Sequence, residues 1–237
     1  MAGLKVDLRS TITALNQDYL LEIAEHYKSI GVKSCAFIPV NPVNSDEDIL
    51  EERLLPSPEK IITGITKVYK SKVWKVEELF PFNQYVSRLC PGAMMVVGCG
   101  APYGNTAVVE VNGDVYPCIY LVGIKKFCLG NIKDESYPKK DLIRWMYDYL
   151  HVDHLEDCKS CPWRYICGGS CPVGRLTVLN NPRATNKVID YCKQIACDYS
   201  KKILELLIWD KARESASTLL KNRRMSEPVD VLTTTRC

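Results

Sequence analysis

The sequence predicts an α+β chain: a strand–helix–strand unit, then a cysteine-rich region of short strands and turns, then a helical C-terminus. Three observations support this order. Residues 4–40 change from strand-like to helix-like hydrophobic spacing and back again. The pair Asn112-Gly113 separates two β-rich runs, which is typical of a hairpin turn. Amphipathic helical spacing returns over 187–222.

The front of the chain is expected to fold as one βαβ unit. Residues 4–13 partly alternate and are rich in β-branched side chains, which predicts a strand. Asn16 is a candidate N-cap for a helix through about Ile30, and Gly31 stands where a C-terminal cap belongs. Residues 32–40 are almost wholly apolar and predict a buried second strand, as in a parallel sheet or barrel.

The rest of the chain is assigned by the same signals. Ser57 before Pro58 marks the start of a helix over 57–80, after a loop at 41–56. Further segments are a short helix at 139–150, a cysteine-rich loop region at 155–175 and a frayed tail from Ser226. The expected divisions are residues 1–85, 86–200 and 201–237.

Charge and hydropathy exclude several classes of protein. The 237 residues include 31 basic and 28 acidic ones, a net charge of +3 without long runs, so we expect no nucleic-acid partner. No apolar run approaches the length of a membrane span, so no membrane partner is expected either. The first ten residues lack the apolar core of a secretory signal. These features predict a cytoplasmic protein.

Twelve cysteines are the most informative feature of the composition. In a reducing compartment, clustered cysteines more often hold metal than form disulfides. Cys35 and Cys128 lie in apolar, strand-like runs and are expected to be packed thiols, and Cys237 an exposed tail thiol.

Seven of the other cysteines stand at ligand-like spacing. Four of them follow the pattern C-x2-C-x5-C-x3-C, from Cys158 to Cys171. Cys99 and Cys118 flank the predicted hairpin, in the pattern C-x13-G-x4-C, and Cys192 follows twenty residues after Cys171. Thiolates at such spacing suit zinc or iron–sulfur clusters. One four-cysteine zinc site would leave several of these thiols unexplained, so the spacing favours iron–sulfur clusters and leaves zinc open.

The whole pattern resembles the SPASM domain of radical S-adenosylmethionine (SAM) enzymes, as do the flanking runs GCGAPYGNTAVVEVNGDVYPC and CPWRYICGGSC. The resemblance implies two auxiliary [4Fe–4S] clusters. It assigns Cys99, Cys118 and Cys171 to the first cluster. The second cluster would be held by Cys158, Cys161, Cys167 and Cys192.

The fourth ligand of the first cluster stays open. Cys90, nine positions before Cys99, is the main candidate, and Cys197 is a weaker one because a mid-helix cysteine is more often packed. A cluster held by protein normally takes four thiolates, which favours Cys90. Without it, one iron would be open to a substrate thiolate.

Residues 1–80 resemble the last third of the partial (β/α)6 barrel that precedes this domain in radical SAM enzymes. By that resemblance Arg9, Ser10 and Thr11 are candidate SAM contacts, against the simpler reading of a strand end with no ligand. The chain has no C-x3-C-x2-C triad, the motif that binds the SAM-cleaving cluster. SAM is therefore expected only if the missing half of the barrel is supplied, either by a longer chain or by a separate one.

Two functions follow, and the sequence leaves open whether this chain is itself an enzyme. The first is part of a peptide maturase that forms thioether or related crosslinks, with a peptide or protein as substrate. Ile119 stands where anaerobic sulfatase maturases have an aspartate proposed as the catalytic base, and the text after it resembles maturases of cysteine-rich peptides. The alternative is a stand-alone iron–sulfur module for electron transfer or scaffolding. A zinc-stabilised binding domain is a third reading.

Overall fold

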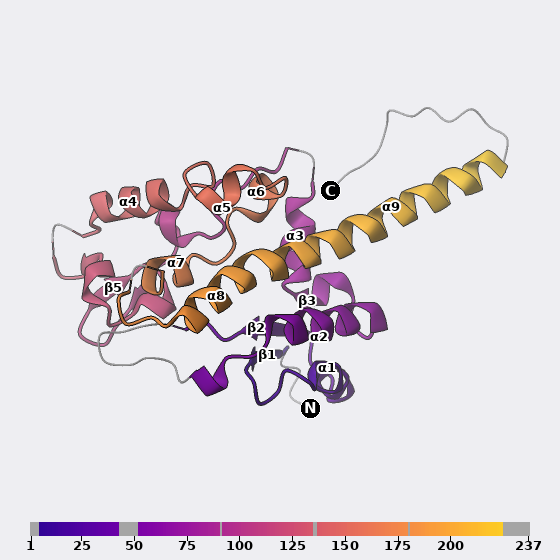
Figure 1. Ribbon diagram of the computed structural model, residues 1–237, viewed down its shortest axis with the longest axis horizontal. Coiled ribbons are helices and arrows are strands. Elements are labelled where there is room, and N and C mark those ends of the chain that lie inside the picture. Colours follow the sequence, from indigo (N-terminus) through magenta and orange to yellow (C-terminus); the bar gives the residue numbers. More distant parts are fainter. Residues whose placement is uncertain (1–4, 43–51, 91, 135–136, 180, 225–237) are drawn as a thin grey trace.

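Three parallel strands form the N-terminal sheet, in the order β1 (Asp7–Ile12), β2 (Ser34–Pro39) and β3 (Leu79–Phe80). In the register of the first pair, Arg9 lies beside Ala36. The computed structural model describes residues 5–42, 52–90, 92–134, 137–179 and 181–224 (Figure 1). The tail from Ser226 and most of the predicted loop at 41–56 lie outside these ranges.

The predicted βαβ unit is confirmed, with helix α1 (Leu20–Ser29) between the first two strands. Gly31 follows this helix with φ of +77°, a conformation that glycine adopts without the steric cost of a Cβ. Asn16 is not the helix N-cap, however. Its Oδ1 accepts from the Thr13 amide at 2.8 Å and its Nδ2 donates to the Thr11 carbonyl at 2.9 Å, so it closes the turn that precedes the helix.

Helix α2 (Pro58–Ser71) begins as the sequence predicts but ends early. The Ser57 hydroxyl accepts from the Lys60 amide, the N-cap bond expected of a serine before a helix. Lys72 then adopts a left-handed backbone, with φ of 56°, which stops the helix. The predicted helix over 57–80 was therefore too long, because its last residues supply the third strand of the sheet.

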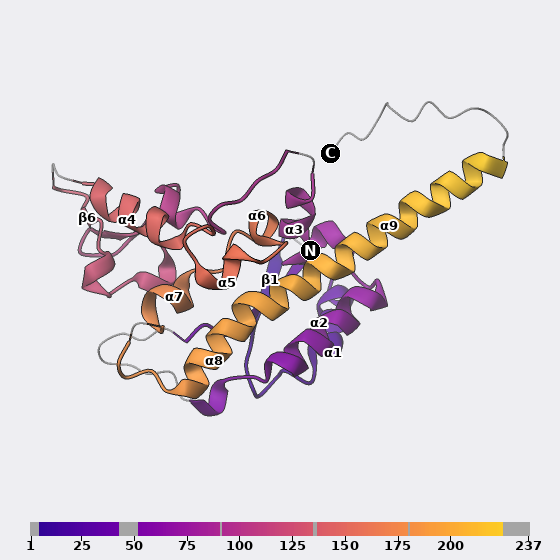
Figure 2. The ribbon, with the colours of Figure 1, turned by 45° about the horizontal axis from the view of Figure 1, so that its top comes forward.

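The C-terminal helices pack onto this first sheet region. Helix α8 (Asn186–Gln194) continues through a π turn (Ile195–Tyr199) into α9 (Ser200–Arg224), as the helical spacing over 187–222 predicts. In Figure 2 this continuous helix runs between α2 and the cysteine-rich segment. The larger core accordingly joins both ends of the chain, with fully buried side chains of Ile12, Phe37, Ile61, Ile203 and Leu204.

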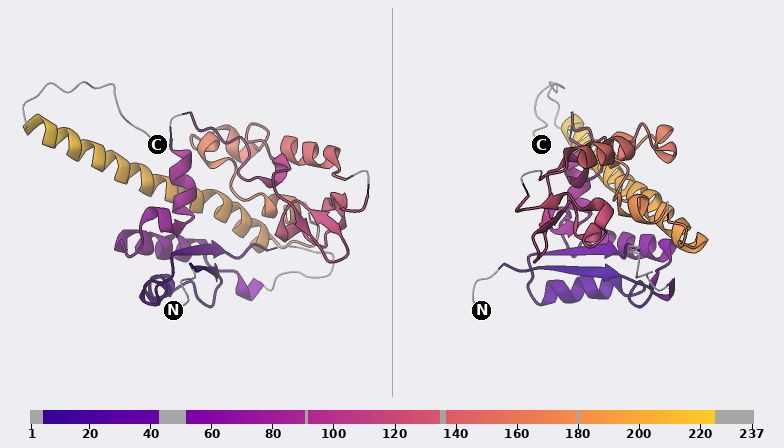
Figure 3. Two further views of the ribbon diagram at one scale, coloured as in Figure 1. Left: turned by 180° about the vertical axis from the view of Figure 1, so that it is seen from behind. Right: turned by 90° about the vertical axis from the view of Figure 1, so that its left-hand side faces the viewer.

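The second part of the chain is built on a small antiparallel sheet of β4 (Val108–Val109), β5 (Asp114–Tyr116) and β6 (Gly130–Asn131). The predicted hairpin turn at Asn112-Gly113 is confirmed, with Gly113 at φ of +92°. Helix α4 (Lys140–Leu150) packs on this sheet through buried Met146 and Leu150. Figure 3 shows the first sheet lying between helix α1 and this second region.

The cysteine-rich segment is more helical than predicted. It contains three short helices, α5 (Glu156–Lys159), α6 (Arg164–Cys167) and α7 (Val173–Thr177), and helix α3 (Phe82–Arg88) leads toward it from the first sheet. The divisions near 85 and 200 stay predictions. Among the described residues, no helix combines the length and apolar character needed to cross a bilayer.

Candidate metal centre

Four cysteines line one hollow between the cysteine-rich segment and the π turn. Four charged side chains, Asp157, Arg164, Arg175 and Lys201, line the same hollow. The cysteines are Cys158, Cys161, Cys167 and Cys197.

Short helical turns aim the first three of these thiols. Cys158 lies in α5, and the Cys161 amide donates to its carbonyl at 3.0 Å, so the C-x2-C pair forms one tight turn. Cys167 ends helix α6, where Gly168 adopts a left-handed backbone at φ of +68°. The left-handed residues at 168–170 then turn the chain away before Cys171, which explains why the fourth cysteine of the pattern faces elsewhere.

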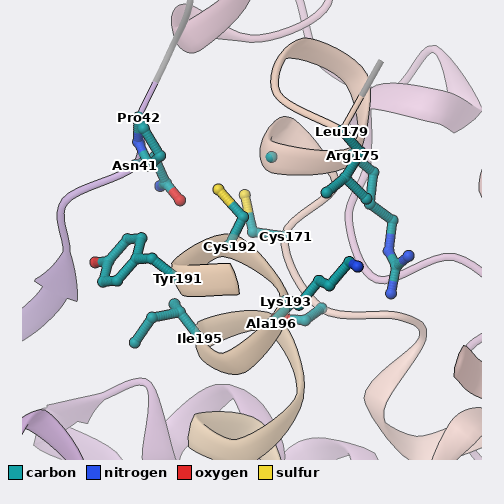
Figure 4. Close-up of a pocket in the computed structure, with 12 residues that line it drawn as sticks. Asn41, Pro42, Cys171, Arg175, Leu179, Tyr191, Cys192, Lys193, Ile195 and Ala196 are labelled. Carbon is teal, nitrogen blue, oxygen red and sulfur yellow. The ribbon is translucent and has the colours of Figure 1, made fainter. Parts of the chain in front are cut away.

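Cys192 does not join this hollow, although the resemblance assigned it there. It lines a separate pocket with Cys171, and Figure 4 shows the two sulfur atoms side by side. A Cβ placed on Gly174 would lie 3.1 Å from the Cys192 sulfur, so a larger residue there would push the thiol aside by a few tenths of an ångström. In the same view the guanidinium of Arg175 turns away from the pair.

The three cysteines that the resemblance assigns to the first cluster lie close together in the structure. Cys99, Cys118 and Cys171 are close enough that each of the other two thiols contributes to the electrostatic environment of Cys171. Their approach depends on a backbone contact: a Cβ on Gly98 would lie 2.5 Å from the Ser170 carbonyl oxygen. Because no side chain fits there, Gly98 allows the segment that carries Cys99 to lie directly on the loop before Cys171.

Cys90 is placed differently from these three. It lies half-buried after helix α3, and it is disulfide-bonded in the structure. A metal ligand must be a thiolate, so its predicted role requires the reduced form and stays a prediction.

A cavity of about 900 Å³, counting the part open to solvent, lies beside Cys99 and Cys171. It reaches the carboxyl end of β2 at Pro39, so it connects the first cysteine group with the strand ends of the sheet. Arg9 and Tyr120 also line it, and the Arg9 guanidinium donates to the Tyr120 hydroxyl across the two parts of the chain.

Of the three candidate SAM contacts, only Arg9 lines this cavity. Successive side chains of a strand point to opposite faces. Ser10 is therefore buried on the helix side, where its hydroxyl lies 2.8 Å from that of Tyr27. Thr11 is exposed and does not line this cavity.

Burial dominates the electrostatics of the thiols. It raises the pKa of Cys158 and of Cys171 to about 11, and Arg175 acts in the opposite direction on Cys158. Both thiols are therefore neutral at pH 7 in the metal-free chain, and a metal would have to displace their protons.

The four-thiol hollow fits an iron–sulfur cluster by its donors. Its ligands are all sulfur, the donor set of protein-held clusters. The Nε of Arg175, in a side chain only 8% exposed, has no hydrogen-bond partner within the described chain. A bound anionic cluster would offer this N–H a sulfur acceptor. In the described part of the chain, no three His, Cys, Asp or Glu are arranged around a single metal ion.

Comparison with known proteins assigns the cysteine-rich segment to a class. Residues 99–162 match the family model of SPASM, an iron–sulfur cluster-binding domain. Sequence relatives are anaerobic sulfatase-maturating enzymes. The cysteine-type enzyme of Clostridium perfringens is 35% identical over 66 residues, which is 27% of this chain and 18% of that protein. The serine-type enzyme of Bacteroides thetaiotaomicron is 29% identical over 77 residues, 31% of this chain and 18% of that protein.

The fold is similar to solved structures of one such maturase. The native anSMEcpe with bound AdoMet aligns with a TM-score of 0.56 and 20% identity, over 85% of this chain and 56% of that one. Its complex with AdoMet and the Kp18Cys peptide gives 0.57 and 19%, over 85% and 57%. The chain thus spans little more than half the length of these structures. The chain therefore has a mixed α/β fold similar to that of this maturase.

Sequence reasoning missed Cys197 as a member of the four-thiol group. Cys197 lies in a predicted helix, where a cysteine is more often packed than bound to a metal. No local sequence signal predicts the π turn. The presence of two cysteines, Cys192 and Cys197, near the position of one expected ligand was the available signal.

Proposed function

We propose that this chain is the C-terminal part of a radical SAM/SPASM maturase that modifies a peptide or protein and holds two [4Fe–4S] clusters. The observation that carries the proposal is the separation of the thiols into two groups. The first group contains Cys99, Cys118 and Cys171, and the second contains Cys158, Cys161 and Cys167. Two groups of thiols are what two clusters require.

The cavity beside the first group is the proposed substrate site. It is lined by both apolar side chains and Arg9, and it lies next to Cys99 and Cys171, so a peptide there would meet the first cluster. The similar solved structures include complexes with the Kp18Cys and Cp18Cys peptides. We therefore propose that the substrate of this chain is also a peptide.

The finer proposal is thioether or related crosslink formation. Ile119, two-thirds exposed, follows Cys118 and cannot accept a proton. The proposed base position of the sulfatase maturases is thus apolar here, which supports different chemistry on the substrate. When bound, the auxiliary clusters would accept an electron or anchor a substrate thiolate. SAM cleavage would need the rest of the barrel, from residues upstream in a longer protein or from a separate chain.

Iron content tests the proposal. Anaerobic reconstitution should give a brown protein with about eight irons per chain, the sum of two [4Fe–4S] clusters. About four irons would leave one cluster only, and a colourless protein with zinc would replace the proposal with a structural zinc domain.

A second candidate, a stand-alone iron–sulfur module, is favoured by one observation: the 237 residues contain no C-x3-C-x2-C triad. The reduced chain mixed with SAM should therefore produce no 5′-deoxyadenosine above background. Turnover restored by a chain that carries the triad would support the maturase. Failure of every such chain encoded nearby would support the stand-alone module.

A further inference from the structure

We propose that Cys197, and not Cys192, is the fourth thiolate of the second cluster. The inference rests on the proposed iron–sulfur function and concerns this chain's own ligands. Cys197 lines the hollow formed by Cys158, Cys161 and Cys167, and Cys192 does not.

The spacing of the two cysteines around the C-terminal helix gives this arrangement its geometry. Five positions separate Cys192 from Cys197, and in an α-helix that spacing would turn two side chains about 140° apart around the axis. Cys197 lies within the π turn Ile195–Tyr199, where one extra residue changes the phase of the helix. Single π turns inside α-helices are frequent at functional sites. The helix thus presents one cysteine to each of two hollows.

The contacts on either side of the helix keep the two cysteines apart. Arg175 and Ala196 line both hollows, so they form the wall between them. Gly174 leaves room for the Cys192 sulfur on the Cys171 side.

Arg175 supplies a second observation that points to a ligand in the four-thiol hollow. Its Nη1 donates to Asp157 Oδ2 at 3.2 Å, which fixes the guanidinium at the edge of the hollow. Its buried Nε keeps an unused N–H, the only such nitrogen besides the Arg164 Nε in the described chain. Four thiolates and bound sulfide would be anionic, and hydrogen bonds to such sulfurs tune an iron–sulfur cluster.

The test isolates the second cluster in the full chain. Cys118→Ala removes the first cluster, leaving about four irons per chain. In this background Cys197→Ala should lose nearly all remaining iron, and Cys192→Ala should keep it. Cys128→Ala, at a thiol outside both groups, is the matched control. The opposite pattern, with iron lost at Cys192 and kept at Cys197, would overturn the inference, and so would retention of iron in both variants.

A spectroscopic experiment distinguishes the loss of a cluster ligand from misfolding of the variant. In the same background Cys197→Ser offers an oxygen ligand, so the electron paramagnetic resonance signal of the reduced cluster should shift, while Cys192→Ser should leave it unchanged. An unchanged signal in Cys197→Ser would count against the inference. If the unmodified chain binds zinc and no iron, the proposed function fails, but zinc content of the same variants still decides which cysteine is the ligand.

Discussion

Arg88 bonds directly to the backbone of Cys167. Its Nη1 donates to the Cys167 carbonyl at 3.0 Å, and its Nη2 donates to the Gly98 carbonyl at 2.8 Å. One buried guanidinium therefore links the segment before Cys99 to the turn that carries Cys167, and so couples the two thiol groups.

Replacing Arg88 with Met should destabilise the fold and both thiol groups. Two buried carbonyls would lose a charged donor, a cost of about 3 kcal/mol in the free energy of unfolding. Denaturant unfolding and iron content after gel filtration measure the effect. Lys202→Met, which breaks an exposed pair with Glu205, is the control and should cost about 0.5 kcal/mol or less. Equal stability of the two variants would show that the Arg88 bonds contribute little.

Gly98→Ala should disturb the first thiol group more than an ordinary glycine substitution would. The new Cβ would meet the Ser170 carbonyl at 2.5 Å, so the backbone must move and Cys99 with it. We expect loss of about four irons of the reconstituted eight.

The matched control is Gly31→Ala, where φ is +77° and no atom lies within 4 Å of the new Cβ. It should cost only about 1 kcal/mol of backbone strain and leave the iron content unchanged. Full iron in Gly98→Ala would mean that the two backbones can separate without harm to the cluster.

The fourth ligand of the first cluster can be identified with the second cluster removed by Cys161→Ala. The sequence indicates Cys90 and the structure places Cys192 beside Cys171, so both are compared in this background. Because Cys192 already lies in the same pocket as a proposed ligand, we expect Cys192→Ala to lose the remaining four or so irons and Cys90→Ala to keep them. Loss at Cys90 alone would return that cysteine to the ligand set.

The ion pair of Asp210 should make the attachment of α9 dependent on pH. Hydrogen bonds from the Tyr69 hydroxyl, at 2.7 Å, and from Lys72, at 2.9 Å, lower the pKa of the Asp210 carboxyl below its ordinary 3.8. A lowered pKa contributes stability above the unfolded value, and this contribution is lost as the pH falls through the folded pKa.

Asp210→Asn should therefore lower the free energy of unfolding by about 1–2 kcal/mol at pH 7. The difference from the unmodified chain should shrink as the pH falls below the ordinary carboxyl pKa of 3.8 and through the lowered pKa of the folded state. Thermal unfolding followed by circular dichroism across this range measures it, with Glu205→Gln as an exposed control. A difference that is constant with pH would rule out the ion pair as its cause.

The sequence by itself determined the local elements and the ligand chemistry. Alternation and helical spacing placed β1, α1 and β2, and the Asn112-Gly113 turn placed the hairpin, because these signals act between neighbours in the chain. The cysteine spacing also indicated a thiolate metal site, since a tight C-x2-C turn can present two sulfurs to one centre whatever surrounds it.

Only the tertiary structure decided which thiols face one another. The end of α2 at Lys72 was missed because residues 79–80 are recruited by the sheet, a long-range pairing that local propensity does not contain. Cys192 and Cys197 look alike in the sequence. Their five-residue spacing places them on different sides of the C-terminal helix, and Arg175 and Ala196 form the wall between them. Which hollow each thiol faces depends on how this helix packs between the two halves of the chain.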